Sequence, residues 1–162
     1  MRESYGKHTG NKFCAYSIEK GFSLVELLIV VAIIAIIVAI AVPNFLVARK
    51  SAQASSMMGD LRTILTAETA YYIGPGKSTY GNFIALETHQ FLPSNLSSGA
   101  TSYNRYGYTG TLTLTNNDAS FSMHVDSIPI TNISPSFFID ESGLIRYNTA
   151  TSATATDPPV GT

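Results

Sequence analysis

The most prominent hydrophobic pattern in the chain is an unbroken apolar run near its N-terminus. Sixteen consecutive apolar residues extend from Leu27 to Val42, and the apolar character already begins at Phe22. A helix over residues 22–42 would rise about 1.5 Å per residue and span roughly 30 Å. Because this length covers the hydrocarbon core of a bilayer, we predict a transmembrane helix over these residues.

Beyond this run, apolar residues recur at helical spacing with charged residues between them. They predict that the helix continues as an amphipathic helix over residues 44–73, whose apolar stripe packs on a sheet. Gly74-Pro75-Gly76 predicts its end. Pro43 cannot donate an amide hydrogen bond towards Ala39, so we expect the helix to kink or loosen there. The stripe consists of Phe45, Ala48, Ala52, Met58, Leu61, Ile64, Leu65, Tyr71 and Tyr72.

The second half of the chain alternates between apolar and polar residues and is rich in Thr and Tyr. It predicts an antiparallel sheet of hairpins over residues 105–148, with a first strand over 105–115. A connecting loop over 74–104 contains a short helix around 83–90. The predicted fold class is therefore α+β, with a long helix packed by its second half against a small antiparallel sheet.

The predicted globular domain comprises residues 43–148. Residues 149–162 contain mainly Thr, Ala, Ser, Pro and Gly with one charged residue. Such a composition is too poor in large apolar groups to order itself, which predicts a flexible tail.

The charge pattern around the apolar run predicts its orientation. Four basic residues precede it, and under the positive-inside rule they stay in the cytoplasm, which places the chain after Val42 on the far side. A cleavable secretory signal is an alternative, because Ala39-Ile40-Ala41 offers small residues at a suitable spacing. The basic residues are Arg2, Lys7, Lys12 and Lys20.

Glu26 is the feature that neither a plain anchor nor a secretory signal explains. A carboxylate costs about 2.5–3.5 kcal/mol at the centre of a membrane, and less near its interface. No cationic side chain within the span can pair with it. The partner must therefore come from another molecule or from a newly created terminus.

The residues around Glu26 resemble a known family. Lys20-Gly21-Phe22-Ser23-Leu24-Val25-Glu26-Leu27-Leu28-Ile29-Val30 is similar to the signature of type IV pilins and type II secretion pseudopilins. The resemblance implies that residues 1–21 are a leader, cut by a prepilin peptidase between Gly21 and Phe22. It also implies methylation of Phe22, retention of the apolar helix and a pilin-like fold. The family carries a proline at the place of Pro43.

The resemblance also implies a function and a set of partners. The mature helix would polymerise into a homo-oligomeric filament, a pilus or a secretion pseudopilus, on an inner-membrane assembly platform driven by a cytoplasmic ATPase. The chain would cross the inner membrane once, with its domain in the periplasm, before the filament reaches the periplasm or the cell surface. Within a filament, Glu26 would meet the terminal ammonium of a neighbour. A processed minor pilin or membrane-anchored binding module is the alternative.

Composition argues against several other functions. A net charge of −1 and a charged fraction of 13% give no surface for nucleic acid. His8, His89 and His124 are scattered, and no catalytic motif occurs, so no enzyme is predicted. Cys14 alone builds neither a disulfide nor a thiolate cluster, and no cofactor or metal is expected. A calcium site is a weaker alternative that would need acidic turn residues without a recognisable ligand pattern, namely Asp118, Asp126, Asp140 and Glu141.

Overall fold

The computed structural model describes residues 21–161. The predicted leader, except Gly21, lies outside these residues, as do the upstream basic residues, His8 and Cys14. A single helix, α1 (Leu24–Ile73), contains both the apolar run and the amphipathic segment. Its first part belongs to a compact unit that ends at Ile40, and the rest belongs to a globular unit that begins at Ala41.

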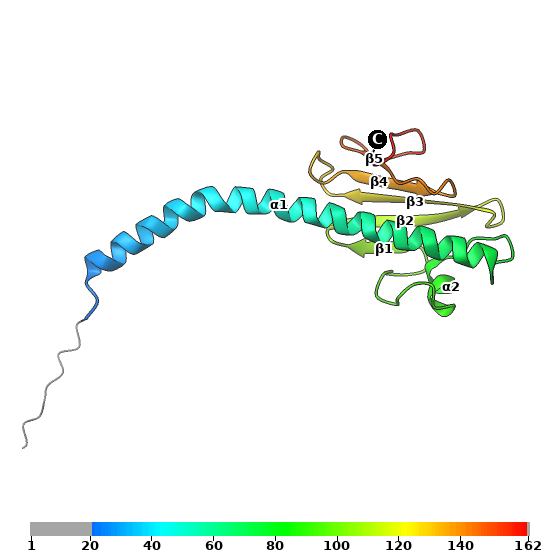
Figure 1. Cartoon of the computed structure of the whole chain (residues 1–162), viewed down its shortest axis with the longest axis horizontal. Coiled ribbons are helices and arrows are strands. Elements are labelled where there is room, and N and C mark those ends of the chain that lie inside the picture. The colour runs from blue at the N-terminus through cyan, green and yellow to red at the C-terminus, as the bar shows by residue number, and fades with distance from the viewer. Residues whose placement is uncertain (1–20, 162) are drawn as a thin grey trace, which may run out of the picture. The chain divides into compact units, whose positions relative to one another are not determined.

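The globular unit consists of the second part of α1, a short helix and one sheet. The α1 segment lies across one face of the sheet (Figure 1). All strand pairs are antiparallel, and neighbours in the sheet follow chain order, β1-β2-β3-β4-β5. The predicted α+β fold class is therefore confirmed. The elements are α2 (Phe83–Thr88), β1 (Ser102–Arg105), β2 (Tyr108–Thr115), β3 (Ser120–Ser127), β4 (Ser136–Asp140) and β5 (Arg146–Asn148).

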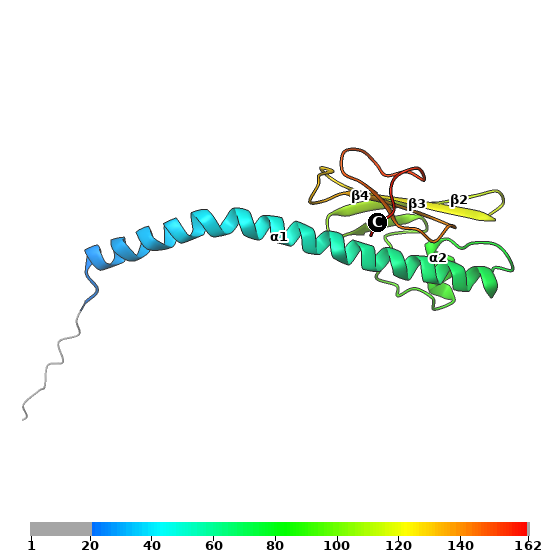
Figure 2. The same cartoon turned by 45° about the horizontal axis from the view of Figure 1, so that its top comes forward.

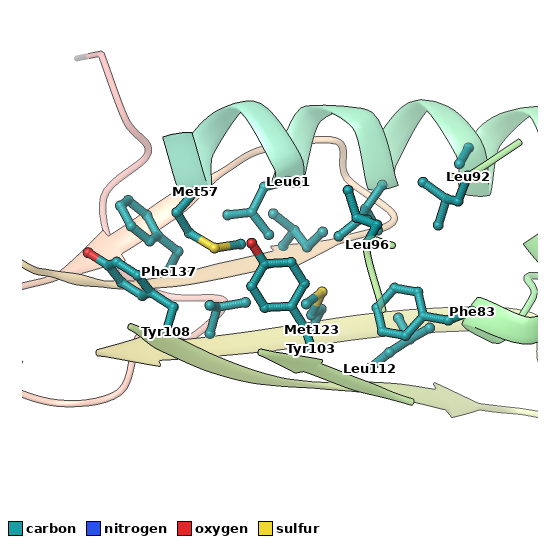
Figure 3. Close-up of a cluster of buried hydrophobic side chains, with 14 of the residues drawn as sticks. Met57, Leu61, Phe83, Leu92, Leu96, Tyr103, Tyr108, Leu112, Met123 and Phe137 are labelled. Carbon is teal, nitrogen blue, oxygen red and sulfur yellow. The ribbon is translucent and has the colours of Figure 1, made fainter. Parts of the chain in front are cut away.

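The hydrophobic core lies between α1 and the inner face of the sheet. Met57 and Leu61 point from α1 towards Tyr103, Leu112 and Met123 of the sheet (Figure 3). The α2 region closes the core at one end through Phe83, Leu86, Leu92 and Leu96. Burying this set of large side chains is the main stabilising contribution, at about 1.5–3 kcal/mol for each.

The buried stripe of α1 differs in part from the predicted one. Leu61 and Ile64 are buried as expected, but Phe45, Ala48 and Ala52 are exposed. The helix instead buries Ala54, Met57 and Ala67, which complete a stripe spaced by three and four residues. The small side chains of Ala54 and Ala67 allow α1 to pack closely on the sheet. Because alanine is only weakly hydrophobic, the sequence pattern did not place these two residues in the buried stripe.

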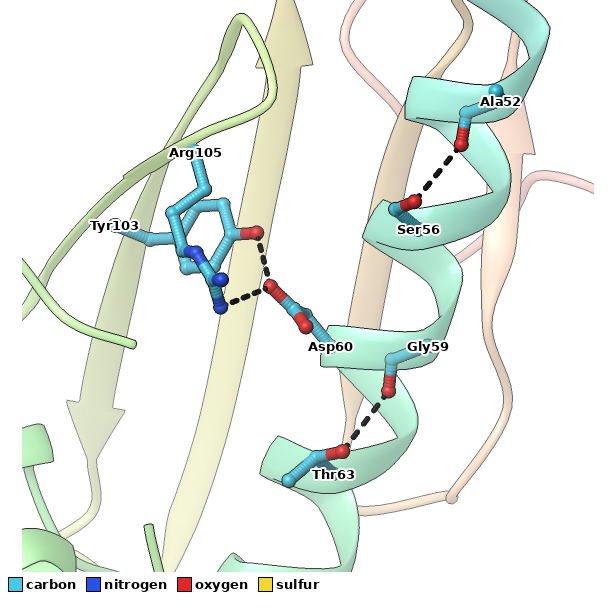
Figure 4. Close-up of polar contacts among 7 residues, drawn as sticks. All are labelled: Ala52, Ser56, Gly59, Asp60, Thr63, Tyr103 and Arg105. Atoms are coloured by element: carbon cyan, nitrogen blue, oxygen red, sulfur yellow. Dashed lines mark hydrogen bonds and ion pairs between the residues drawn. The ribbon is translucent and has the colours of Figure 1, made fainter. Parts of the chain in front are cut away.

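A polar contact fixes the same helix segment to β1. Asp60 Oδ2 accepts a hydrogen bond of 2.8 Å from the Tyr103 hydroxyl and lies 2.9 Å from Nη1 of Arg105 (Figure 4). The guanidinium of Arg105 also lies over the ring of Tyr106, 4.9 Å from its centroid. One carboxylate therefore ties the middle of α1 to the edge strand.

The predicted strand over 105–115 is wrong at its start, because the chain turns there. β1 ends at Arg105 and pairs it with Tyr108, so Tyr106 and Gly107 form a two-residue hairpin turn. Both have positive φ angles, 56° and 78°, as a tight hairpin turn requires. The predicted loop over 74–104 likewise ends early, since β1 begins at Ser102.

The C-terminal residues are packed, in contrast to the flexible tail that composition predicts. Figure 2 shows α1 on one side of the sheet and part of this segment on the other. Ala153 is fully buried, and its carbonyl oxygen lies 3.1 Å from Nδ1 of His124. Val160 N donates to Ile145 O at 2.8 Å, which covers the outer edge of β5. Backbone and side-chain hydrogen bonds thus order a segment that lacks large apolar groups.

Candidate functional site

The predicted cleavage bond lies just outside the helix. Gly21 and Phe22 have no regular secondary structure and are exposed, Phe22 at 76%. Peptidases act on extended, accessible segments in preference to helical ones. The Gly21–Phe22 bond therefore has the local structure that cleavage requires, while Lys20 lies outside the described residues.

Ser23 and Glu26 form a capping box at the start of α1. The Ser23 hydroxyl accepts a hydrogen bond from Val25 N at 3.3 Å, and the Glu26 carboxylate accepts one from Ser23 N at 3.0 Å. These two reciprocal bonds satisfy amide groups that have no partner within the helix. The spacing Ser-x-x-Glu before an apolar run is the sequence signal for this motif, and the sequence analysis above missed it.

The capping box gives Glu26 a partner in its own chain, although not a charged one. A helix cap contributes about 1 kcal/mol, and an acid in the first turn also interacts favourably with the helix dipole. A carboxylate near the middle of a membrane costs about 2.5–3.5 kcal/mol. The cap therefore offsets part of that cost.

The apolar part of α1 is not covered by the rest of the described chain. Its most apolar stretch has a mean hydropathy of 3.3, and none of that stretch is buried. By length and composition, this part of the helix can cross a membrane. Large side chains along it are exposed throughout, from Leu24 at 77% to Ile40 at 67%. Such a surface requires lipid or other protein to cover it.

Helical structure continues through Pro43. The missing amide bond towards Ala39 and the β-branched neighbours Ile40 and Val42 weaken the helix here. We predict a continuous helix before assembly and local loosening inside a filament. A filament reconstruction checks this, and helical hydrogen bonds unbroken from Ile33 to Leu46 would contradict it.

Five exposed hydroxyls on the amphipathic part of α1 bond to the helix itself. The side chains of Ser55, Ser56, Thr63, Thr66 and Thr69 each donate to the carbonyl four residues earlier, at 2.8–3.1 Å. This arrangement turns their methylene and methyl groups outwards. A neighbouring molecule can therefore cover these five residues without leaving their hydroxyl donors unpaired.

Glu68 is a second acid that sequence analysis did not single out. It is fully buried at the end of α1, where its Oε2 accepts a hydrogen bond from Gly81 N at 3.0 Å. Oε1 has no hydrogen-bond partner in the described part of the chain. Burial raises the pKa of Glu68 to about 7, against the opposing effect of the Gly81 bond. The sequence offers no signal for this burial, because a charged residue at this spacing is usually solvated.

The remaining ionisable residues form no catalytic or metal-binding cluster within residues 21–161. His89 lies against the ring of Tyr71, with 5.6 Å between centroids, and His124 lies on β3. No group of three or more His, Cys, Asp and Glu side chains comes together in this part of the chain. Asp118 and Glu141 lie in turns, while Asp126 Oδ2 accepts a hydrogen bond from the Ser152 hydroxyl at 2.8 Å.

Comparisons with known proteins match the N-terminal region. Residues 17–42 match the family model described as the prokaryotic N-terminal methylation motif. The chain is 36% identical over 89 residues to the type IV major pilin protein PilA of Myxococcus xanthus, covering 55% of this chain and 36% of that protein. In its N-terminal region the chain therefore resembles type IV pilins, which supports membership of that family. It is also 46% identical over 54 residues to the type IV wide pilus major component PilA4 of Thermus thermophilus, covering 33% of this chain and 41% of that protein.

These matches cover well under two thirds of both pilin relatives. The matched methylation motif includes Gly21, Phe22 and Glu26 and ends at residue 42, one residue before Pro43. Both relatives are structural pilus proteins by name, and neither is an enzyme. The resemblance that sequence analysis identified is therefore confirmed at the level of the family.

Proposed function

We propose that this protein is a structural subunit that polymerises through α1 into a type IV pilus. The observation that carries the proposal is the exposed apolar part of α1, joined to a globular unit whose core is already closed. In a membrane, lipid covers that helix, and in a filament, the helices of other copies replace the lipid. The relatives' names, a major pilin and a major pilus component, support a role as the bulk subunit.

Processing would create the partner that Glu26 lacks. Cleavage after Gly21 leaves a terminal ammonium on Phe22, about one helical turn from Glu26. Methylation keeps this group cationic. Copies that stack with an axial offset would bring the carboxylate of one subunit to the ammonium of the next, so that both charges are paired inside an apolar core.

The proposal assigns the chain an orientation and several partners. Lys20 and the other upstream basic residues would keep the leader in the cytoplasm, with the globular unit in the periplasm. A prepilin peptidase would cut and methylate at Phe22. An inner-membrane assembly platform and a cytoplasmic ATPase would supply the work of polymerisation. No nucleic acid partner is proposed, because the net charge of −1 and the charged fraction of 13% do not favour binding to a polyanion.

The proposed cleavage after Gly21 predicts the mature N-terminus. Mass spectrometry of the membrane-bound or filament-bound protein should find a chain that begins with N-methylated Phe22, because the Gly21–Phe22 bond is exposed and outside the helix. A chain that begins at Val42 would establish a secretory signal and refute the proposal.

The composition of sheared filaments distinguishes a bulk subunit from a minor one. If the proposal is correct, this chain is the dominant protein in the preparation. A trace amount, with normal N-terminal processing, would favour the minor pilin instead.

A further inference from the structure

The loop between β3 and β4, residues 128–135, carries exposed isoleucines that the core does not use. Ile128 is 83% exposed and Ile133 is 37% exposed. Two prolines accompany them, and the loop contains no charged residue. An apolar surface of this kind, gathered in one loop, marks a contact with lipid or with another protein.

Hydrogen bonds within the loop hold these side chains outwards. The Ser127 hydroxyl lies 3.1 Å from Pro129 O and 2.5 Å from Ser134 O. Thr131 N donates to Ser134 O at 2.9 Å, and Ser134 N donates to Thr131 O at 3.0 Å. Because the backbone is already ordered, covering the isoleucines costs little further conformational entropy.

The loop lies beside the part of α1 that follows the apolar run. Ile133 from the loop and Ser51 and Ser55 from the helix are among the residues that line a groove of about 340 Å³. Figure 1 shows the loop at the end of the sheet where α1 enters the globular unit. The apolar part of α1 is joined to the unit at this same end, because the unit begins at Ala41.

Arg49 and Lys50, which we call the basic pair, mark the height at which α1 leaves a membrane. Both are exposed, and they are the first charged residues after Glu26. Residues 27–48 carry no charge and, at about 1.5 Å per residue, rise about 33 Å, close to the roughly 30 Å of a hydrocarbon core. The basic pair therefore falls at the level of the lipid phosphates, which are anionic.

We propose that the loop docks the globular unit on the phospholipid surface before assembly. Ile128 and Ile133 insert among the headgroups, and the basic pair binds their phosphates. Ser55, beside the loop, follows the basic pair by less than two helical turns, or about 8 Å. The headgroup region extends about 5–8 Å beyond the core on each side, so the loop reaches it. The proposal rests on the membrane anchoring in the proposed function, but not on the filament.

The test uses the absence of tryptophan from the chain. Ile128→Trp places a single reporter in the loop, and Ile73→Trp places one at the far end of α1, where the native side chain is similarly exposed, at 78%. Both full chains are reconstituted in phosphatidylglycerol vesicles that contain phospholipid with a nitroxide near the acyl carbonyl. Ile128→Trp should be quenched at least about three-fold more than Ile73→Trp, because interfacial side chains lie about 5–10 Å into the headgroup and acyl boundary.

Charge provides the second arm of the test. Arg49→Gln with Lys50→Gln, in the Ile128→Trp background, should lower the ratio of docked to undocked protein by about ten-fold or more, since each basic residue near an anionic surface adds to the attraction. Hydrogen exchange needs no substitution. In the wild-type chain, amides of residues 128–133 should exchange more slowly in phosphatidylglycerol vesicles than in phosphatidylcholine vesicles, and those of residues 74–78 should not change.

Equal quenching of the two tryptophans, or none in the loop, would refute the docking. Quenching of Ile128→Trp that requires a high protein-to-lipid ratio would make the loop a contact between copies and would also overturn it. Quenching and exchange that ignore the basic pair and the anionic lipid would do the same. If an alkaline wash removes the full chain from the vesicles, the membrane span and the proposed function fail as well. If the chain is retained without quenching, the docking alone fails.

Discussion

Glu26→Ala should greatly reduce entry of the processed subunit into filaments. An incoming subunit would bury its terminal ammonium with no carboxylate to meet it, and broken buried ion pairs cost about 3–5 kcal/mol. Because the loss is repeated at every subunit, it should prevent extended polymers. Membrane insertion should be unchanged or improved, since the substitution removes a charge from the span. Co-expression of both chains, with each counted in sheared filaments, measures the effect.

The capping box adds a second role that this substitution also removes. Glu26→Ala loses the bond to Ser23 N as well as the charge, so a loss of assembly after this change has two possible causes. Glu26→Gln separates them, because its amide oxygen can still accept the Ser23 bond but carries no charge. Ser23→Ala is the complementary control. It removes the hydroxyl that accepts a hydrogen bond from Val25 N and keeps the charged carboxylate of Glu26.

If the ion pair is the decisive contact, Glu26→Gln should fail to assemble nearly as completely as Glu26→Ala. Ser23→Ala should assemble with a modest defect, because a helix cap is worth about 1 kcal/mol. Peptidase cleavage should remain largely intact in the Glu26 variants, since the cut lies several residues away. Normal entry of processed Glu26→Gln would show instead that the acid serves the helix start, and the salt-bridge model would be abandoned.

The N-terminal region was the most predictable part of the molecule. The apolar run, Glu26 and the Gly21-Phe22 pair are local features, so their spacing alone predicts a helix and identifies the family. The same residues contain the capping box, whose two hydrogen bonds require only a helix that starts at Leu24. The Ser-x-x-Glu spacing that begins at Ser23 would therefore have been enough to predict the capping box.

The globular unit was predictable in class but not in detail. A long helix on an antiparallel sheet follows from hydrophobic periodicity, whereas the face of α1 that is buried depends on how closely the sheet approaches. Small residues such as Ala54 and Ala67 permit that close approach, but alanine is too weakly hydrophobic to mark the buried face in the sequence. The turn at Tyr106 was missed because tyrosine favours strands and only its neighbour Gly107 signals a turn.

Contacts between distant segments explain the remaining errors. Asp157 accepts hydrogen bonds from Thr154 N at 2.7 Å and from Asn148 Nδ2 at 3.0 Å, which holds the C-terminal segment beside β5. The composition of this segment shows only that it lacks large apolar residues, so it could not predict these hydrogen bonds. Glu68 is the corresponding case on α1, where burial depends on the chain that follows the helix and returns with Gly81.

Stability of the wild-type domain should fall as the pH rises from about 4.5 to about 7, through the effect of Glu68. Burial raises the pKa of this group from 4.5 to about 7. Between these values the folded state holds a proton that the unfolded state has released, so a higher pH favours unfolding. The shift corresponds to about 3 kcal/mol at most, since one pKa unit is about 1.36 kcal/mol. Above pH 7 this contribution is constant, and below 4.5 both states are protonated.

Glu68→Gln should remove this component of the pH dependence. Glutamine keeps an oxygen for the bond from Gly81 N but cannot ionise, so its unfolding free energy should change less between pH 5 and pH 8 than that of the wild type. Chemical unfolding of the full chain in non-ionic detergent at the two pH values measures the difference.

Glu141→Gln changes the same chemical group at an exposed turn and should leave the pH dependence close to that of the wild type. Equal pH dependence in the wild type and Glu68→Gln would mean that Glu68 is ionised in the folded domain at both pH values, with water reaching Oε1. Both acids of α1 would then be ionised. Glu26 would be paired with a cation from another subunit, and Glu68 would be solvated by water inside its own subunit.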